Sequence, residues 1–347
     1  MADNKATSKA QEFKALSKKD QQRKIGDLIL NNAMYIIIAI AIIFITVKQP
    51  KFISLSSIVN IISLTAAKLP IALGIGGCIV LTGTDISAGR VVGLAACISA
   101  SLLTTVFKVF PNMTSAMPIP VVLLIVLGVG AAVGFVNGFS VAKFKLHPFI
   151  VTLSTQLITY GIILMYLMNG VNNGQTLSGL TDSYRSLITG TLFTIGGVAI
   201  PRYVLYAVIL TAVMWVIWNK TTFGKNMFAV GSNEEAANVS GVNVARTIIL
   251  VFMLAGVMYG ITGFFDGARI ASANANTGLN YECDAIAACV IGGIGRISGI
   301  VVGVLLLQII FAGLNFLSVD PNMLYIIKGL IILVACAIDM RKYLVRK

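Results

Sequence analysis

A short polar stretch interrupts the apolar chain at residues 82–90, which read Thr-Gly-Thr-Asp-Ile-Ser-Ala-Gly-Arg. Its functional groups belong to Thr84, Asp85, Ser87 and Arg90. In a membrane, a central Asp or Arg costs roughly 2.5–3.5 kcal/mol on insertion scales, so such residues normally face a cavity or pair with each other. These four residues are therefore candidates for lining a transport pathway or its gate. The local alternative is that Asp85 or Ser87 caps the helix that follows.

A second polar stretch, residues 231–242, predicts a short helix between two apolar segments. Ser232 or Asn233 is a suitable N-cap, two acidic residues follow in the first turn, and Gly241 ends the helix. Such a helix suits docking into a groove on a soluble partner; the alternative is an ordinary surface helix. The candidate docking residues are Asn233, Glu234, Glu235, Ala236, Ala237, Ser240 and Gly241.

The sequence offers no set of residues for enzyme chemistry. It contains no GxxxxGK[ST] motif, so we expect no ATP hydrolysis by that route. The only histidine is His147, and none of the five cysteines has metal-ligand spacing. We therefore predict no enzyme activity, no ATPase site and no metal or cofactor in this chain.

Few ionisable residues lie within the apolar segments. Lys68 and Asp266 are embedded in them, whereas Glu282 and Asp284 are expected to be exposed at an outer mouth. A proton-coupled carrier would need a chain of carboxylates inside the membrane. The scarcity of such groups argues against that mechanism.

The composition of the chain indicates that membrane helices position the candidate residues. The 347 residues are 57% hydrophobic and 11% charged, well outside the range of soluble globular domains. Strand alternation is absent, which predicts an all-α integral membrane protein, a polytopic bundle of about 8–10 transmembrane helices with broken or re-entrant elements. The apolar segments are 29–48, 58–82, 89–107, 119–142, 149–168, 198–218, 247–268, 284–295, 297–318 and 323–338.

Charge predicts how these segments are oriented. Most of the 26 Lys and Arg residues fall on one side if the N-terminus is cytoplasmic, as the positive-inside rule requires. This gives a basic cytoplasmic tail (1–28), a single transmembrane domain (29–340) and a basic cytoplasmic C-terminus (341–347). The loop 219–246 then lies inside and the loop 169–197 outside.

Glycines recur at helical spacing within several apolar segments. Gly130, Gly134 and Gly138 form one GxxxGxxxG pattern, and Gly256 with Gly260 forms a GxxxG pair. In lipid, small residues at this spacing let two helix backbones approach closely. We therefore expect close helix crossings at these glycines.

Four motifs together resemble the permease subunits of sugar-importing ABC transporters of the ribose/galactose type. The resemblance runs from about residue 30 to the end, and it is closest to permeases of the galactose/methyl-galactoside type. One departure is that Gly292-Gly293-Ile294-Gly295-Arg296 lacks about half a dozen residues of the family's Ser/Gly-rich turn. The motifs are GSNEEAANVSGVNV, LTGTDISAGRVVGLAA, NGFSVAKFKLHPFIVTL and YECDAIAACVIGG.

The resemblance implies a homodimer in a bacterial cytoplasmic (inner) membrane, with both termini cytoplasmic. Two cytoplasmic ATP-binding subunits would dock on the inner loops, and an extracytoplasmic sugar-binding protein would deliver a monosaccharide. Residues 233–241 would form the ATPase-coupling loop, and the polar stretch 82–90 would lie beside the pathway or its inner gate. ATP would be used by the partner subunits, and transport would follow alternating access.

Two other functions remain open at the level of sequence. The same permease class could carry ribose, another pentose or a nucleoside, and the sugar-binding partner would distinguish these cargoes. An ion-coupled secondary transporter would instead act without any ATPase. Nucleic acid is not an expected partner of either.

Overall fold

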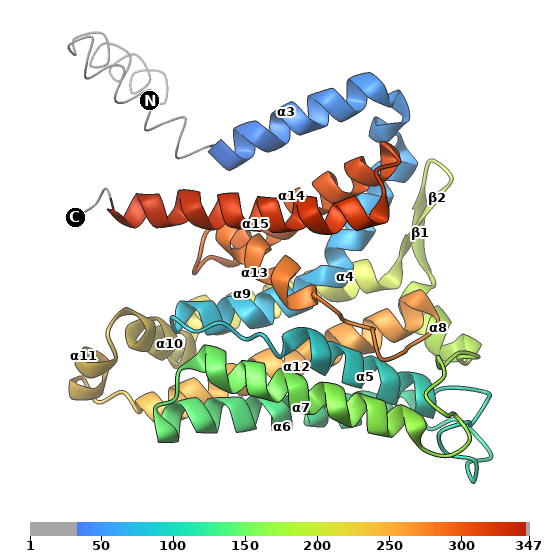
Figure 1. Ribbon diagram of the computed structural model, residues 1–347, viewed down its shortest axis with the longest axis horizontal. Coiled ribbons are helices and arrows are strands. Elements are labelled where there is room, and N and C mark those ends of the chain that lie inside the picture. The colour runs from blue at the N-terminus through green and yellow to red at the C-terminus, as the bar shows by residue number, and fades with distance from the viewer. Residues whose placement is uncertain (1–32, 345–347) are drawn as a thin grey trace. The chain divides into compact units, whose positions relative to one another are not determined.

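Helices form nearly all of the regular structure, as the apolar segments predict (Figure 1). The structure is a computed structural model that describes residues 33–344, so the predicted tail 1–28 and residues 345–347 lie outside it. The elements in chain order are α3 (Ala33–Lys48), η1 (Pro50–Ile53), α4 (Leu55–Val80), α5 (Ala88–Leu102), α6 (Ile119–Phe144), α7 (Pro148–Met168), α8 (Asp182–Thr189), β1 (Thr191–Ile195), β2 (Val198–Pro201), α9 (Arg202–Lys220), α10 (Thr222–Ser232), α11 (Glu234–Val239), α12 (Val244–Ile270), α13 (Tyr281–Gly292), α14 (Ile297–Phe316) and α15 (Pro321–Leu344).

The described residues divide into two compact units. One comprises residues 51–312 and contains every candidate site. The other contains α3 and α15. The prediction of a single transmembrane domain over 29–340 stays a prediction.

Six helices of the described part are long and apolar enough to cross a membrane, namely α4, α6, α7, α9, α12 and α14. α5 begins at Ala88, directly after the polar break, but it ends at Leu102 rather than near 107 as expected. α13 is shorter still, with 12 residues. The bundle therefore contains complete spans and incomplete ones, which agrees with the broken elements that the sequence predicts.

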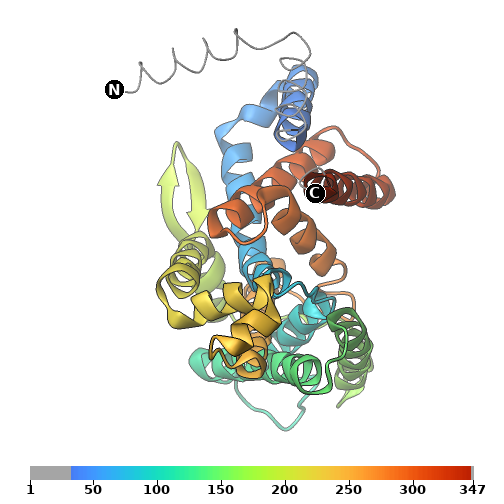
Figure 2. The same cartoon turned by 90° about the vertical axis from the view of Figure 1, so that its left-hand side faces the viewer.

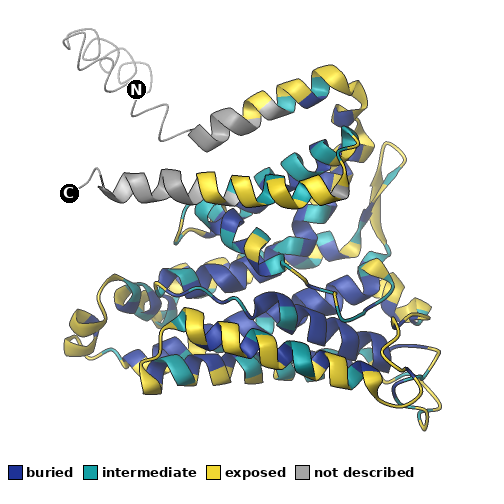
Figure 3. Cartoon of the chain, viewed as in Figure 1, coloured by how far each residue is buried: buried dark blue, intermediate teal, exposed yellow. Residues whose placement is uncertain are grey.

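α12 is the central helix of the unit 51–312 and is buried along most of its length (Figure 3). The close helix crossing predicted at the glycines of α6 is present, and its partner is α12: a Cβ on Gly130 would lie 2.1 Å from the Gly256 carbonyl oxygen. A Cβ on Gly134 would lie equally close to the carbonyl oxygen of Phe252. These two backbones touch because no side chain separates them.

We expect Gly134→Ala to destabilise the protein, because the added methyl group has backbone rather than a movable side chain in front of it. Overpacking of this kind costs about 1–3 kcal/mol. Gly128→Ala is the matched control on the same helix, because no atom lies within 4 Å of a Cβ there. Thermal unfolding of the purified protein in detergent should show a lower midpoint for Gly134→Ala only. Equal midpoints for the two variants would contradict the close α6–α12 crossing.

The loop between α7 and α9, which we predict to lie outside, is more ordered than the sequence suggested. It contains α8 and an antiparallel hairpin of β1 and β2, and α9 begins at Arg202, so the expected span from 198 is wrong at its start. Gly196 and Gly197 both have positive φ in the two-residue turn, which suits hairpin geometry. The ring of Tyr184 on α8 is buried against Phe264 of α12, and its hydroxyl donates to the Phe264 carbonyl.

Residues 271–280, between α12 and α13, are not helical and run back along α5. A Cβ on Gly93 would lie 2.3 Å from the Thr277 carbonyl oxygen, and a Cβ on Gly89 would lie 2.4 Å from that of Gly278. At these two glycines, α5 therefore packs against an irregular backbone segment rather than against another helix. Non-helical backbone at membrane depth is tolerated only where protein or a water-filled cavity surrounds it.

Candidate functional site

Asp85 is the centre of a buried hydrogen-bond network in the break between α4 and α5. Its Oδ1 accepts bonds from the amide of Ser87 at 3.0 Å and from the Ser87 hydroxyl at 2.6 Å, and its Oδ2 accepts from the Tyr259 hydroxyl at 3.2 Å. The Ser87 side chain makes no capping bond to α5, so the expectation that Ser87 caps this helix is wrong. Asp85 instead holds the chain entering α5 and ties it to α12.

The network continues into α6 and α7 through residues that the sequence reasoning did not single out. The side-chain amide of Asn137 donates to the Ser87 hydroxyl at 3.0 Å, and its oxygen accepts from Thr155 at 2.6 Å. The hydroxyl of Thr152 accepts from the Ile86 amide at 3.1 Å. Asn137 and Thr152 lie within the motif 137–153 that carries part of the family resemblance, but as single residues their only signal was a polar side chain within an apolar span. Four helices and the break are therefore connected by satisfied polar groups.

Thr84 and Arg90 lie at the edges of this network. The Thr84 carbonyl accepts a bond from the Thr152 hydroxyl at 3.2 Å. Arg90 points away from Asp85: its guanidinium donates to the Ala275 carbonyl at 2.9 Å and lies 4.1 Å from the ring centroid of Tyr160. Arg90 thus holds the irregular segment 271–280 against α5, rather than neutralising the buried aspartate.

Two further acids are buried, one of them as the sequence predicted and the other against expectation. Glu282, which we expected to be exposed, is only 4% exposed, because the segment 271–280 carries the start of α13 inward to Gly89. Asp266 is fully buried and accepts a 2.9 Å bond from Nε of Arg269, one turn further along α12. Burial next to a partner reduces the cost of keeping such a charge in the membrane.

The predicted inner-loop helix is present as α11, with the predicted cap residues. The Asn233 side chain accepts a 2.8 Å bond from the Ala236 amide, which confirms it as the N-cap. Gly241 follows the helix with a φ of +83°, and the Val242 amide donates to the Ala237 carbonyl. This is the Schellman arrangement, in which glycine is favoured because its φ is positive. The coupling role of α11 stays a prediction.

α10 and α11 lie together at one end of the bundle (Figure 1; Figure 2 shows this end facing the viewer). α10 also connects α11 to the break between α4 and α5. A Cβ on Gly231 would lie 1.9 Å from the Val80 carbonyl oxygen, so α10 touches the last turn of α4. The break that contains Asp85 begins directly after that turn. Lys145, in the α6–α7 turn, pairs with Glu234 at the surface. A movement of α10 would therefore act directly on the end of α4.

The surface of α11 carries an apolar side chain that no internal contact accounts for. Val239 is 89% exposed, whereas Ala237 is buried on the opposite side against the protein. Glu235 is exposed beside it. Val239 and the acidic side chains beside it are therefore the groups that α11 presents to solvent.

Within the part of the chain that the structure describes, no three His, Cys, Asp or Glu side chains lie close enough to hold a metal ion. Cys78, Cys97 and Cys289 are free thiols.

The comparisons with known proteins agree that the chain is similar to permease components of import systems. Residues 57–336 match the family described as branched-chain amino acid transport system / permease component. The galactose/methyl galactoside import permease protein MglC of Haemophilus influenzae is 41% identical, covering 94% of this chain and 99% of that protein. MglC of Escherichia coli K12 is 42% identical, covering 90% of this chain and 95% of that protein. The ribose import permease protein RbsC of Haemophilus influenzae is 33% identical, covering 91% and 95%. No solved structure matches the chain significantly.

Proposed function

Since this chain belongs to the family of branched-chain amino acid transport system permease components, we propose that it is the membrane-spanning subunit of an ATP-driven importer of galactose and methyl galactosides. The observation that carries the proposal is the 41–42% identity, over at least 90% of the chain, to galactose/methyl galactoside import permeases. Ribose import permeases are 32–33% identical over 87–91% of the chain. Ribose or another pentose is therefore the second candidate cargo.

The partners follow from the kind of system to which a permease component belongs. A cytoplasmic ATP-binding subunit would dock on α10 and α11, and an extracytoplasmic sugar-binding protein would bind at the opposite end, near α8 and the hairpin. A second copy of the chain would complete a homodimer in the inner membrane. The basic loops support cytoplasmic termini, because positive residues remain on the cytoplasmic side.

The contacts of α10 support a mechanism for coupling. ATP binding would move the docked ATP-binding subunits, and α10 would pass this movement to the last turn of α4, which it touches at Gly231. The Asp85 network would make the break move together with α6, α7 and α12. A path through the bundle would then open alternately to either side of the membrane, without chemistry on the sugar.

The decisive experiment is uptake by proteoliposomes that contain this chain, its ATP-binding subunit and the sugar-binding protein. We expect ATP-dependent uptake of galactose, competed by methyl galactoside and only weakly by ribose. Preferential uptake of ribose would assign the second cargo. Uptake without ATP and without the ATP-binding subunit would overturn the proposal in favour of a secondary transporter.

A further inference from the structure

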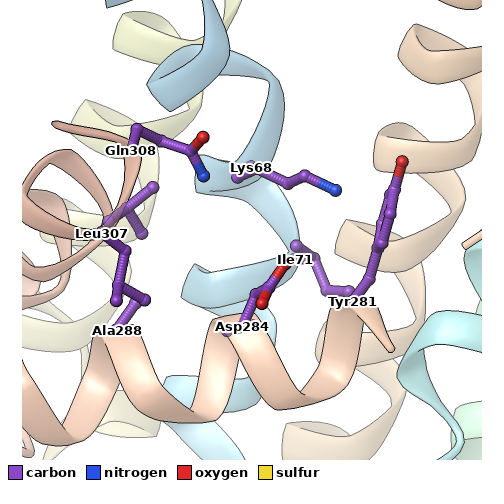
Figure 4. Close-up of a pocket in the computed structure, with 9 residues that line it drawn as sticks. Lys68, Ile71, Tyr281, Asp284, Ala288, Leu307 and Gln308 are labelled. Atoms are coloured by element: carbon purple, nitrogen blue, oxygen red, sulfur yellow. The ribbon is translucent and has the colours of Figure 1, made fainter. Parts of the chain in front are cut away.

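One face of α13 is accounted for by its contacts with α4. Tyr281 and Asp284 lie on this face, and Figure 4 shows Tyr281 beside Lys68 of α4 at a small cavity. The Lys68 Nζ lies 2.6 Å from the centroid of the Tyr281 ring, so the ammonium covers the ring. The cavity has room for about one water molecule, so it holds no larger ligand. Glu282, between these two residues of α13 in the sequence, points instead to α5.

Glu282 is a buried acid with no hydrogen bond at one of its carboxylate oxygens. The residue is 4% exposed, and a Cβ on Gly89 of α5 would lie 2.0 Å from its Oε2. Within the described part of the chain, this oxygen has no hydrogen-bond partner. An unsatisfied polar group is expensive to bury, most of all when it is charged, so each such group in a folded protein needs an explanation.

The charges around Glu282 identify one partner that would satisfy it. Asp85 and Asp284 repel its negative charge, whereas Arg90 of α5 attracts it. Among the ion pairs of the described residues, there is none between Arg90 and Glu282. The guanidinium of Arg90 is instead held by the Ala275 carbonyl, at 2.9 Å. Two opposite charges therefore lie on packed elements without pairing.

The segment 271–280, which Arg90 holds, has left-handed backbone at both ends. Ala271, after α12, has a φ of +59°, and Asn280, before α13, has a φ of +62°. Asparagine tolerates this conformation, but in alanine the Cβ crowds the following carbonyl oxygen. Such a conformation persists only where surrounding contacts hold it, and the bond from Arg90 to Ala275 is one of these contacts. Losing that bond would free the segment to change its conformation.

We propose that Glu282 is the second partner of Arg90, whose guanidinium exchanges the Ala275 carbonyl for the Glu282 carboxylate as the transporter changes between its two open states. The exchange would satisfy the buried carboxylate and release the segment 271–280 from α5. The break that contains Asp85 and the irregular segment would then change together. Glu282 is thus a positioning residue that acts through Arg90. This inference rests on the alternating access of the proposed function.

Pairs of cysteines in the complete transporter, reconstituted with its ATP-binding subunit and sugar-binding protein, test the exchange directly. One variant carries Arg90→Cys with Glu282→Cys, and the other carries Arg90→Cys with Ala275→Cys. Both also carry Cys283→Ser, which removes the exposed cysteine beside Glu282. Disulfide formation under an oxidant is compared between the nucleotide-free transporter and the transporter trapped with ATP and vanadate.

The yields of the two disulfides should change in opposite directions between these states, each by at least about fivefold. This follows because Arg90 leaves one partner when it pairs with the other. Yields that change in the same direction, or that do not respond to nucleotide, would overturn the proposal.

Glu282→Gln distinguishes this role from a purely structural one. The amide has nearly the shape of the carboxylate but no charge, so it removes an unpaired buried charge from this state and the partner of Arg90 from the other. We expect galactose uptake to fall about tenfold, while the thermal midpoint in detergent stays unchanged or rises. A lower midpoint, or normal uptake, would contradict the proposal. Asp320→Asn is the control and should change neither measurement, because Asp320 is exposed and an asparagine oxygen can also accept the bond from the Asn322 amide.

The disulfide measurement does not depend on which sugar is carried. If the unmodified transporter moves no galactoside but the two yields still change in opposite directions, the cargo in the proposed function is wrong and the role of Glu282 stands. If galactoside is moved and the yields do not respond to nucleotide, the role of Glu282 alone fails.

Discussion

Replacing Val239 with glutamate is expected to abolish ATP-driven uptake while leaving the permease folded and inserted. The side chain is 89% exposed, so a charge at this position disturbs no internal packing. In the assembled transporter we expect Val239 to be buried in a groove of the ATP-binding subunit. Burying a valine contributes roughly 1.5–3 kcal/mol. Its replacement by a charge that must be desolvated removes this contribution and adds a penalty.

The measurement for this variant is the amount of ATP-binding subunit that co-purifies with the tagged permease, together with uptake in proteoliposomes. Both should fall by at least roughly tenfold, the equivalent of about 1.4 kcal/mol. Ala245→Glu is the matched control, because Ala245 is exposed at the start of α12 and a glutamate there is favourable to the helix dipole. Undiminished co-purification with Val239→Glu would show that α11 is an ordinary surface helix.

Deleting 234–241 should give the same loss, and Gly241→Glu a related one. Gly241 has open space around a Cβ, so the added side chain meets no steric barrier. Its φ of +83° nevertheless strains any residue with a Cβ, and the end of α11 should shift. Failure of the permease to insert in these variants, in the absence of any partner, would contradict a specific role in coupling.

The ends of α11 and the close helix crossing could be predicted, because residues near one another in the sequence determine both. Asn233 and Gly241 delimit α11 through hydrogen bonds within a few residues of each other. Gly130 and Gly134 mark a close helix crossing because their spacing places them on one face of α6. Neither inference needed knowledge of the distant partner. The identity of that partner, α12, came only from the structure.

Two other features could not be predicted. One depends on contacts between distant segments, and for the other the sequence supports two structures at the same place. Glu282 and Asp284 form a pattern typical of an exposed helix start, yet the inward course of 271–280 buries Glu282. The hairpin had a local signal, since Gly196-Gly197 separates two runs rich in β-branched residues. The second strand is apolar, and the hydropathy pattern therefore includes it in the expected span 198–218. Hydropathy alone does not separate a strand from the start of a membrane helix.

Removing the carboxylate of Asp85 is the second replacement with a large expected effect. Asp85→Ala leaves three donors without their acceptor: the amide and hydroxyl of Ser87 and the hydroxyl of Tyr259. Each unsatisfied buried group costs about 1–3 kcal/mol, although these costs are not additive within one network. The break between α4 and α5 would then no longer be fixed to α12. We expect uptake to fall at least roughly tenfold, while the ATP-binding subunit still co-purifies.

This separation of effects follows from where the two features lie. Asp85 is buried inside the bundle, whereas α11, the proposed docking helix, is exposed and has its own caps, so losing the network should not release the partner. Asp85→Asn retains an acceptor oxygen for Ser87 and should keep part of the uptake, which would show that hydrogen bonding matters more than charge. Equal loss in the Ala and Asn variants would instead assign the effect to the negative charge. Normal uptake with Asp85→Ala would reduce this residue to a replaceable link, and movement of α10 would then have to reach the other helices by packing alone.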